Sequence, residues 1–349
     1  MIGPRGRSRR VVVVAALAAA TLALPPLLPP EWQSLYVFIG LYAIVTCGLS
    51  LLMGFAGQVS LGQAAFYAIG AYAAAIPAVH GAPPALGLLA GPVVAAAVAA
   101  AIGVPLLRLR GHYLAFGMLA FQLILLTFIA EAGDLTGGDI GLRGIPPLGI
   151  GGVQAVTPLE YAYVTWLAVT AVFLITRNVV RSRPGRALRA LATSESAAAA
   201  AGVPVATYKV EVFALSAAYA GLAGAIYAFF LSYIAPGSFP ILLSIQFLVM
   251  AAVGGLGAVW GSLVGAAVVT LVVQLLQEIG SLPAMPTQVP AVLSYAVYAL
   301  VLIVVMLLLP SGIVPALTAR AARRRRDDVA PTEATVGDDP RASRLSSVL

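Results

Sequence analysis

Long stretches of this 349-residue chain contain no charged side chain. Each stretch is close to the roughly 20 residues that an α-helix needs to cross the hydrocarbon of a membrane. The eight clearest runs free of Asp, Glu, Lys and Arg are 11–30, 35–53, 64–79, 85–107, 113–130, 161–176, 212–234 and 289–309. Hydrophobic residues make up 61% of the chain, too much apolar surface for a soluble globule of this size. The sequence therefore predicts a membrane protein with several spans, each helical because lipid cannot hydrogen-bond an open backbone.

One further uncharged run, 241–277, is too long for a single crossing. At about 1.5 Å per residue, one helix of that length would extend well beyond a hydrocarbon core of about 30 Å. A glycine cluster in its middle is the expected break, because glycine tolerates the backbone conformations that end a helix. The break residues are Gly254, Gly255, Gly257 and Gly261. Two spans on either side of the break bring the predicted fold to an all-α protein of about ten transmembrane helices.

The distribution of positive charge predicts the orientation of these helices. With ten crossings and a cytoplasmic N-terminus, only Arg143 falls on the outer side, and the other basic residues fall inside. Both termini are then cytoplasmic, with a basic segment at 1–10, a membrane domain at 11–317 and a tail at 318–349 that we expect to be disordered. The net charge of +7 is explained by topology and by attraction to lipid headgroups, and we expect no nucleic-acid partner.

An arginine-rich segment, 178–209, separates two of the spans on the predicted cytoplasmic side, and we call it the arginine loop. It begins with the helix-breaking pair Pro184 and Gly185, continues with arginines and leucines at amphipathic spacing, and ends in a run of alanines that Gly202 can terminate. Its candidate functional residues are Pro184, Gly185, Arg186, Leu188, Arg189, Glu195 and Gly202. We expect a short rigid helix that docks a cytoplasmic partner. The alternative is that the arginines only anchor the topology, although anchoring alone does not require an alanine helix with a glycine stop.

Two polar, glycine-rich segments carry the remaining functional hypotheses. The first, from Gly54 to Gln63, follows the second span and places neutral hydrogen-bonding groups at membrane depth: Gln58, Ser60 and Gln63. These side chains either line a translocation path or hold helices together, and residue type alone leaves both alternatives open. The second lies in the predicted external loop, 131–160, where Thr136, Gly137, Gly138, Gly141 and Leu142 are expected to shape the outer mouth of the path.

Five segments in this order resemble signature blocks of the branched-chain amino acid ABC transporter permeases, the LivM-type subunits. The blocks are GFAGQVSLGQAAFYAIGA, RLRGHYLAFGMLAF, LTGGDIGLRGIPP, PGRALRALATSESAAAAAG and GGLGAVWGSLVGA, and the resemblance covers about residues 35–315. It implies a permease of the bacterial cytoplasmic membrane that imports branched-chain or other small amino acids. It also implies that residues 184–202 hold the coupling helix, which fits a cleft on the ATPase. Ala199 and Ala200 depart from the pattern, because the family usually has acidic residues in this helix.

The resemblance also implies the partners of the chain. These are a second, homologous permease, two cytoplasmic ATPase subunits, an extracytoplasmic binding protein and the surrounding lipids. No Gly-x-x-x-x-Gly-Lys-Ser/Thr phosphate loop occurs in the sequence, so we expect ATP and Mg²⁺ on the ATPase subunits and no cofactor in this chain.

Other functions remain as alternatives. The same type of permease also serves urea and short amides, so the substrate stays open. An ion-coupled secondary transporter is less favoured, because no predicted span contains an ionisable residue to carry the coupling. An intramembrane enzyme would need a nucleophile with its base or a metal cluster, and we identify no catalytic residue and no metal site.

Overall fold

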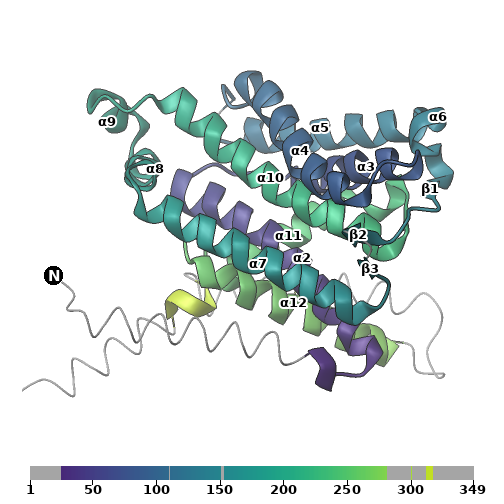
Figure 1. Cartoon of the computed structure of the whole chain (residues 1–349). Coiled ribbons are helices and arrows are strands. Elements are labelled where there is room, and N and C mark those ends of the chain that lie inside the picture. The colour runs from purple at the N-terminus through teal and green to yellow at the C-terminus, as the bar shows by residue number, and fades with distance from the viewer. Residues whose placement is uncertain (1–24, 110, 151–152, 281–299, 301–311, 317–349) are drawn as a thin grey trace, which may run out of the picture.

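The fold is known from a computed structural model, which describes residues 25–109, 111–150, 153–280, 300 and 312–316 (Figure 1). The predicted segments 1–10 and 318–349 lie outside these residues. So do most of the predicted spans 11–30 and 289–309.

Helices dominate the described part of the chain. The eight main apolar helices are α2 (Pro30–Ser50), α3 (Gln63–Val79), α4 (Pro84–Leu106), α5 (His112–Glu131), α7 (Pro158–Arg181), α10 (Val205–Leu231), α11 (Ile241–Gly254) and α12 (Val259–Gly280). Within the described residues, six helical segments are long and apolar enough to cross a membrane, and α3 and part of α12 are shorter apolar helices. Each lies at or within a few residues of a run predicted from the absence of charge.

Short elements connect these helices. They are η1 (Pro25–Leu27), the π-helical turn η2 (Leu51–Phe55), α6 (Gly133–Thr136), η3 (Gly138–Ile140), α8 (Arg183–Thr193), α9 (Glu195–Ala200) and η4 (Pro236–Ser238). Two antiparallel pairs of short strands complete the fold: β1 (Leu142–Arg143) with β4 (Tyr233–Ile234), and β2 (Leu148–Ile150) with β3 (Val153–Ala155). The register sets Leu142 opposite Ile234 in the first pair and Leu148 opposite Ala155 in the second.

Local signals explain where several helices begin. A proline occupies the first turn of α2, α4 and α7, where its missing N–H leaves no hydrogen bond unmade. Helix α7 also has a capping box, in which Thr157 accepts a hydrogen bond from the Glu160 amide and the Glu160 carboxylate accepts one from the Thr157 amide at 2.8 Å.

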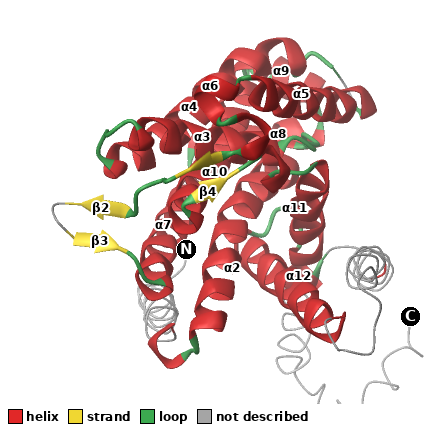
Figure 2. Cartoon of the chain, turned by 90° about the vertical axis from the view of Figure 1, so that its right-hand side faces the viewer, coloured by secondary structure: helices red, strands yellow, loops and turns green. Residues whose placement is uncertain are grey.

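The two loop regions of functional interest lie at opposite ends of the helices. Figure 1 shows α8 and α9 beyond one end of α7 and α10, and α6 with β1 beyond the other end. The β2–β3 hairpin projects sideways from the bundle (Figure 2). Its base is fixed by Tyr161 of α7, whose hydroxyl accepts from the Leu148 amide at 3.1 Å and donates to the Phe229 carbonyl at 2.9 Å.

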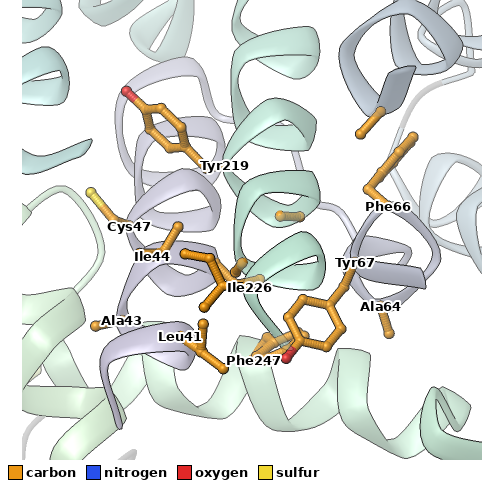
Figure 3. Close-up of a cluster of buried hydrophobic side chains, with 14 of the residues drawn as sticks. Leu41, Ala43, Ile44, Cys47, Ala64, Phe66, Tyr67, Tyr219, Ile226 and Phe247 are labelled. Atoms are coloured by element: carbon orange, nitrogen blue, oxygen red, sulfur yellow. The ribbon is translucent and has the colours of Figure 1, made fainter. Parts of the chain in front are cut away.

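Helices α2 and α10 form the centre of the bundle. Most of their side chains are buried, whereas α4 and α5 are largely exposed on their outer faces. Figure 3 shows the core between them, where Leu41 and Ile44 of α2 meet Ile226 of α10 and aromatic rings from α3 and α11. The Tyr67 and Phe247 rings lie 5.9 Å apart, edge to face, in this layer.

Small residues allow α3, α4 and α10 to pack backbone against backbone. A Cβ atom added to Gly70 of α3 would collide with the backbone of Gly221 in α10. Gly91 of α4 faces the same point, because a Cβ there would lie 2.9 Å from the Gly221 carbonyl oxygen. Gly224, one turn further along α10, lies directly on the Tyr67 carbonyl of α3. In lipid no hydrophobic effect drives helices together, so the dispersion contacts that such close approach allows stabilise their packing instead.

The glycine cluster between α11 and α12 separates two helices of unequal length. Helix α11 ends at Gly254, and Gly255 and Gly257 adopt positive φ angles of 106° and 83° in the turn. The expected lengths of about eighteen residues each are not observed: α11 has 14 residues and α12 has 22. Helix α11 starts at Ile241, where the uncharged run begins, and is short because it ends at Gly254, the first glycine of the cluster. Helix α12 starts at Val259 and continues beyond the run to Gly280. Gly261 lies inside α12, where it packs on the backbone of Gly254.

The glycine contact between α3 and α10 generates a stability prediction. Gly70→Ala should lower the free energy of unfolding by about 1–3 kcal/mol or more, because the methyl group overlaps backbone atoms that cannot rotate away. Gly237→Ala is the matched control, since no atom lies within 4 Å of its added Cβ. Thermal unfolding of the two purified variants in detergent measures the difference. Equal midpoints would show that α3 and α10 do not approach as closely as described here.

Candidate functional site

The arginine loop folds into two short helices, which corrects the single helix expected from its sequence. Helix α8 ends at Thr193, and α9 begins at Glu195. Ser194 between them is extended, with φ −161° and ψ 116°, and its hydroxyl accepts a hydrogen bond from the Ala197 amide at 3.3 Å. The chain breaks here because a serine at the N-cap of α9 satisfies one of the free amides of the new helix.

Helix α8 is amphipathic. Gly185, Leu188 and Leu191 are buried, whereas Arg186 and Arg189 are exposed on the opposite side. Arg181, Arg183 and Pro184 at the entry to the helix are exposed as well. The buried side rests on the end of α7, where Gly185 lies against the carbonyls of Val179 and Val180. Helix α8 therefore presents a surface of exposed arginines, and its buried leucines fix its position on the bundle.

The second helix, α9, is tied to α10 by an ion pair. The Lys209 ammonium of α10 donates a hydrogen bond to the carboxylate of Glu195, the first residue of α9. The Lys209 side chain is only 13% exposed, whereas that of Glu195 is 47% exposed. After α9, Gly202 has a φ of 81°, a left-handed backbone conformation that is unfavourable for residues with a side chain. No atom lies within 4 Å of a Cβ added to Gly202, so only this conformation, and not lack of space, favours glycine here.

The first glycine-rich segment lies against both the arginine loop and the α11–α12 break. A Cβ added to Gly57 would lie 3.3 Å from Ala192 Cα in α8. On the other side, Gly54 packs directly on the backbone of Gly257. The Gly257 amide also donates to the Ser50 hydroxyl at 3.3 Å. Three segments far apart in sequence are therefore in contact here.

The three polar side chains of this segment are buried, but they differ in their hydrogen bonding. Gln63 donates from Nε2 to the Ser216 hydroxyl of α10 at 3.0 Å, while its Oε1 has no partner. Both amide atoms of Gln58 lack a partner within the described part of the chain, and so does the Ser60 hydroxyl. Gln58 is 5% exposed and Ser60 is 1% exposed. Buried polar groups of this kind are costly to leave without a hydrogen bond, which distinguishes Gln58 and Ser60 from Gln63.

Other buried polar residues continue this layer and were not identified from sequence. The Ala64 amide at the start of α3 donates to the Ser244 hydroxyl at 2.9 Å, and Ser244 donates to Gln122 Oε1 at 2.8 Å. Gln122 Nε2 in turn donates to the Phe239 carbonyl at 3.3 Å. A signal was available, because Gln122, Ser216 and Ser244 are isolated polar residues within uncharged apolar runs.

A cavity of about 580 Å³ joins the first glycine-rich segment to the arginine loop, and we call it the α9 cavity. It opens between the 57–59 segment, the α4–α5 turn, α9 and the first turns of α10. Its lining residues are Gly57, Gln58, Val59, Leu107, Leu109, Gly111, Leu114, Glu195, Ser196, Ala199, Val205 and Lys209. Gln58 and Glu195, two residues selected from sequence for separate roles, thus line one space, together with Lys209, which was not selected from sequence.

The predicted outer-mouth residues lie in and around α6 and β1, at the opposite end of the helices from α8 and α9 (Figure 1). Thr136 ends α6, and its buried hydroxyl oxygen lies 2.6 Å from the Ile129 carbonyl oxygen and 2.8 Å from the Ala132 carbonyl oxygen, which share its one proton. Gly137, Gly138 and Gly141 have positive φ angles of 78°, 58° and 84°, and Leu142 begins β1. These turns lock the segment onto β4, so it is an ordered loop.

No metal centre is evident in this part of the molecule. Among the residues that the structure describes, no three His, Cys, Asp or Glu side chains are grouped so that they could hold a metal ion.

Residues 33–306 match the family described as branched-chain amino acid transport system, permease component. The chain is 30% identical over 268 residues to the high-affinity branched-chain amino acid transport system permease protein LivM of Salmonella typhimurium, covering 68% of this chain and 62% of that protein. It is 28% identical over 300 residues to LivM of Escherichia coli, covering 77% and 69%. No solved structure matches significantly.

The different hydrogen bonding of Gln58 and Gln63 predicts different effects on stability. Gln63→Leu should lower the free energy of unfolding by about 1 kcal/mol, because it removes the bond to Ser216. Gln58→Leu should leave stability unchanged or raise it, since it removes two buried atoms that have no partner. Thermal unfolding of both variants, with Ser216→Ala as the matched partner of Gln63→Leu, measures this. A larger loss for Gln58→Leu than for Gln63→Leu would mean that Gln58 is a packing residue.

Proposed function

Because this chain belongs to the family of branched-chain amino acid transport permeases, we propose that it is the membrane subunit of an ATP-driven importer of branched-chain amino acids. The LivM proteins of Salmonella typhimurium and Escherichia coli, to which the chain is similar, are both named as permease proteins of high-affinity branched-chain amino acid transport systems. The observation that carries the proposal is the contact between Gly57 and Ala192, which joins the arginine surface of α8 to the loop that presents Gln58.

The arginine surface of α8 is the proposed contact for an ATPase subunit. Buried Leu188 and Leu191 fix the helix to the bundle, so a push on the exposed side is transmitted to the residues underneath. Arg186 and Arg189 provide charge-assisted donors for carboxylates on a partner. The chain has no phosphate loop, and ATP with Mg²⁺ is therefore assigned to two separate ATPase subunits.

Gln58, Ser60 and Gln63 are the proposed polar side of the translocation path. An amino acid crosses as a zwitterion, whose two charged ends need hydrogen bonds but must also be released. Neutral amide and hydroxyl groups with free hydrogen-bonding capacity suit that requirement, and Gln58 and Ser60 have such capacity. The outer-mouth residues from Thr136 to Leu142 are proposed to meet an extracytoplasmic binding protein, and a second homologous permease is proposed to complete the path.

Transport should depend on ATP and on no ion gradient. Proteoliposomes that contain the complete complex, ATP, a protonophore and no sodium should accumulate leucine, because the Asp, Glu, Lys, Arg and His side chains of the described spans lie near the helix ends and none lies in the apolar middle of a span. Arg186→Glu should lose both uptake and substrate-stimulated ATP hydrolysis while the protein still inserts into the membrane. Glu211→Gln, an exposed charge change on α10 outside the α9 cavity, is the control and should retain both.

Two outcomes would contradict the proposal. Uptake that collapses with the protonophore despite maintained ATP would favour an ion-coupled secondary transporter. Full ATPase stimulation in Arg186→Glu would remove α8 from the ATPase contact. Uptake of urea or acetamide in place of leucine would instead reassign the substrate to the urea and short-amide class and leave the mechanism intact.

A further inference from the structure

The α9 cavity combines three kinds of lining that are each suited to one part of a small amino acid. Its volume of about 580 Å³ falls within the roughly 300–1,000 Å³ range of small-molecule sites. The carboxylate of Glu195 and the ammonium of Lys209 are paired at one wall. Aliphatic side chains, among them Leu107, Leu114 and Val205, form other parts of the lining.

Gln58 gives the cavity a buried amide with unused hydrogen-bonding capacity. Both its Nε2 and its Oε1 have no partner, although the residue is only 5% exposed and lines the cavity. One amide can donate to a carboxylate and also accept from an ammonium group. A buried donor and acceptor that are both unused are a stronger sign of a ligand site than a charged surface would be.

We propose that the α9 cavity is a binding site for a zwitterionic amino acid with an aliphatic side chain. The ligand carboxylate replaces Glu195 at Lys209, and the ligand ammonium binds Glu195. The Gln58 amide, whose two polar atoms are covered in the free site, turns toward the ligand and completes the hydrogen bonds. The aliphatic side chain packs on Leu107, Leu114 and Val205. No covalent bond changes, and the ion pair of the free site is exchanged for two ion pairs with the ligand.

The charge balance of the site selects a zwitterion over a simple anion or cation. Among the lining residues that the structure describes, only Glu195 and Lys209 carry a charge, and they neutralise each other. A ligand with a single charge would leave one of them unpaired, at the larger cost for Lys209, which is largely buried. A zwitterion pairs both. The same argument disfavours an anionic lipid headgroup or a phosphate, because the arginines of α8 that could bind such groups are not among the described residues that line the cavity.

The orientation of the site in the membrane rests on the proposed function, which puts α8 and α9 on the cytoplasmic side. A ligand that reaches the site from this side is the imported amino acid after its release. The cavity adjoins α9 and the first turns of α10, on the side proposed to face the ATPase. An amino acid bound there lies between α9 and α10 and separates Glu195 from Lys209. Accumulated product in the cytoplasm would thereby hold the coupling segment in one position and slow further import.

Equilibrium binding of radiolabelled L-leucine to the full complex in nanodiscs, without the extracytoplasmic binding protein, tests the site. The wild-type complex should bind leucine saturably, and leucinamide and 4-methylpentanoate should compete at least tenfold more weakly, because each lacks one charge. Lys209→Gln should weaken binding at least tenfold. Val205→Phe should do the same by filling the cavity without a change of charge, and Glu211→Gln should bind as the wild type does.

Each outcome bears on one proposal. Saturable binding that both Lys209→Gln and Val205→Phe weaken supports the site, and Val205→Phe alone decides if Lys209→Gln does not fold. No saturable binding, or binding that a folded Val205→Phe leaves unchanged, overturns the site. ATP-driven leucine uptake by the same wild-type complex with its binding protein separates the two proposals. Uptake without binding overturns this inference alone, whereas absence of uptake overturns the proposed function.

Discussion

Close backbone packing of α3 on α10 is the constraint on which the functional geometry depends. Gly70, Gly91 and Gly221 bring three helices together at one point, where a single methyl group would force them apart. This contact sets the position of α3, and hence of Gln63 at its first turn, which bonds to Ser216 on α10. In a membrane no hydrophobic force between helices would compensate for a poor fit, so the glycines determine where the polar layer lies.

The same principle connects the polar layer to the arginine loop. Gly57 and Gly54 are small enough to let the segment between α2 and α3 contact α8 on one side and the α11–α12 turn on the other. The arginines therefore occupy a surface that is mechanically joined to Gln58, with Leu188 and Leu191 as its anchor. The Glu195–Lys209 pair adds a second, polar link between α9 and α10 that an amino acid can open.

Sequence reasoning predicted the elements well and their contacts less well. The absence of charge located the main helices of the described residues, because lipid imposes that pattern on each span separately. It did not find the split at Ser194, where a hydrogen bond within the loop overrides the helix preference of the neighbouring alanines. Nor could it pair Lys209 with Glu195, or Gln122 with Ser244, since these partners meet only after distant helices pack.

The central claim is that α8 and the segment between α2 and α3 move as one body, and pulsed electron paramagnetic resonance can measure this directly. Spin labels would replace Arg189 on α8, Val59 beside Gln58, and Leu135 at the far end, all of which are exposed, while Cys47 is buried and would resist labelling. When a non-hydrolysable ATP analogue binds the complex, the distance between 189 and 59 should stay constant while both distances to 135 change together. A change between 189 and 135 with none between 59 and 135 would contradict the account.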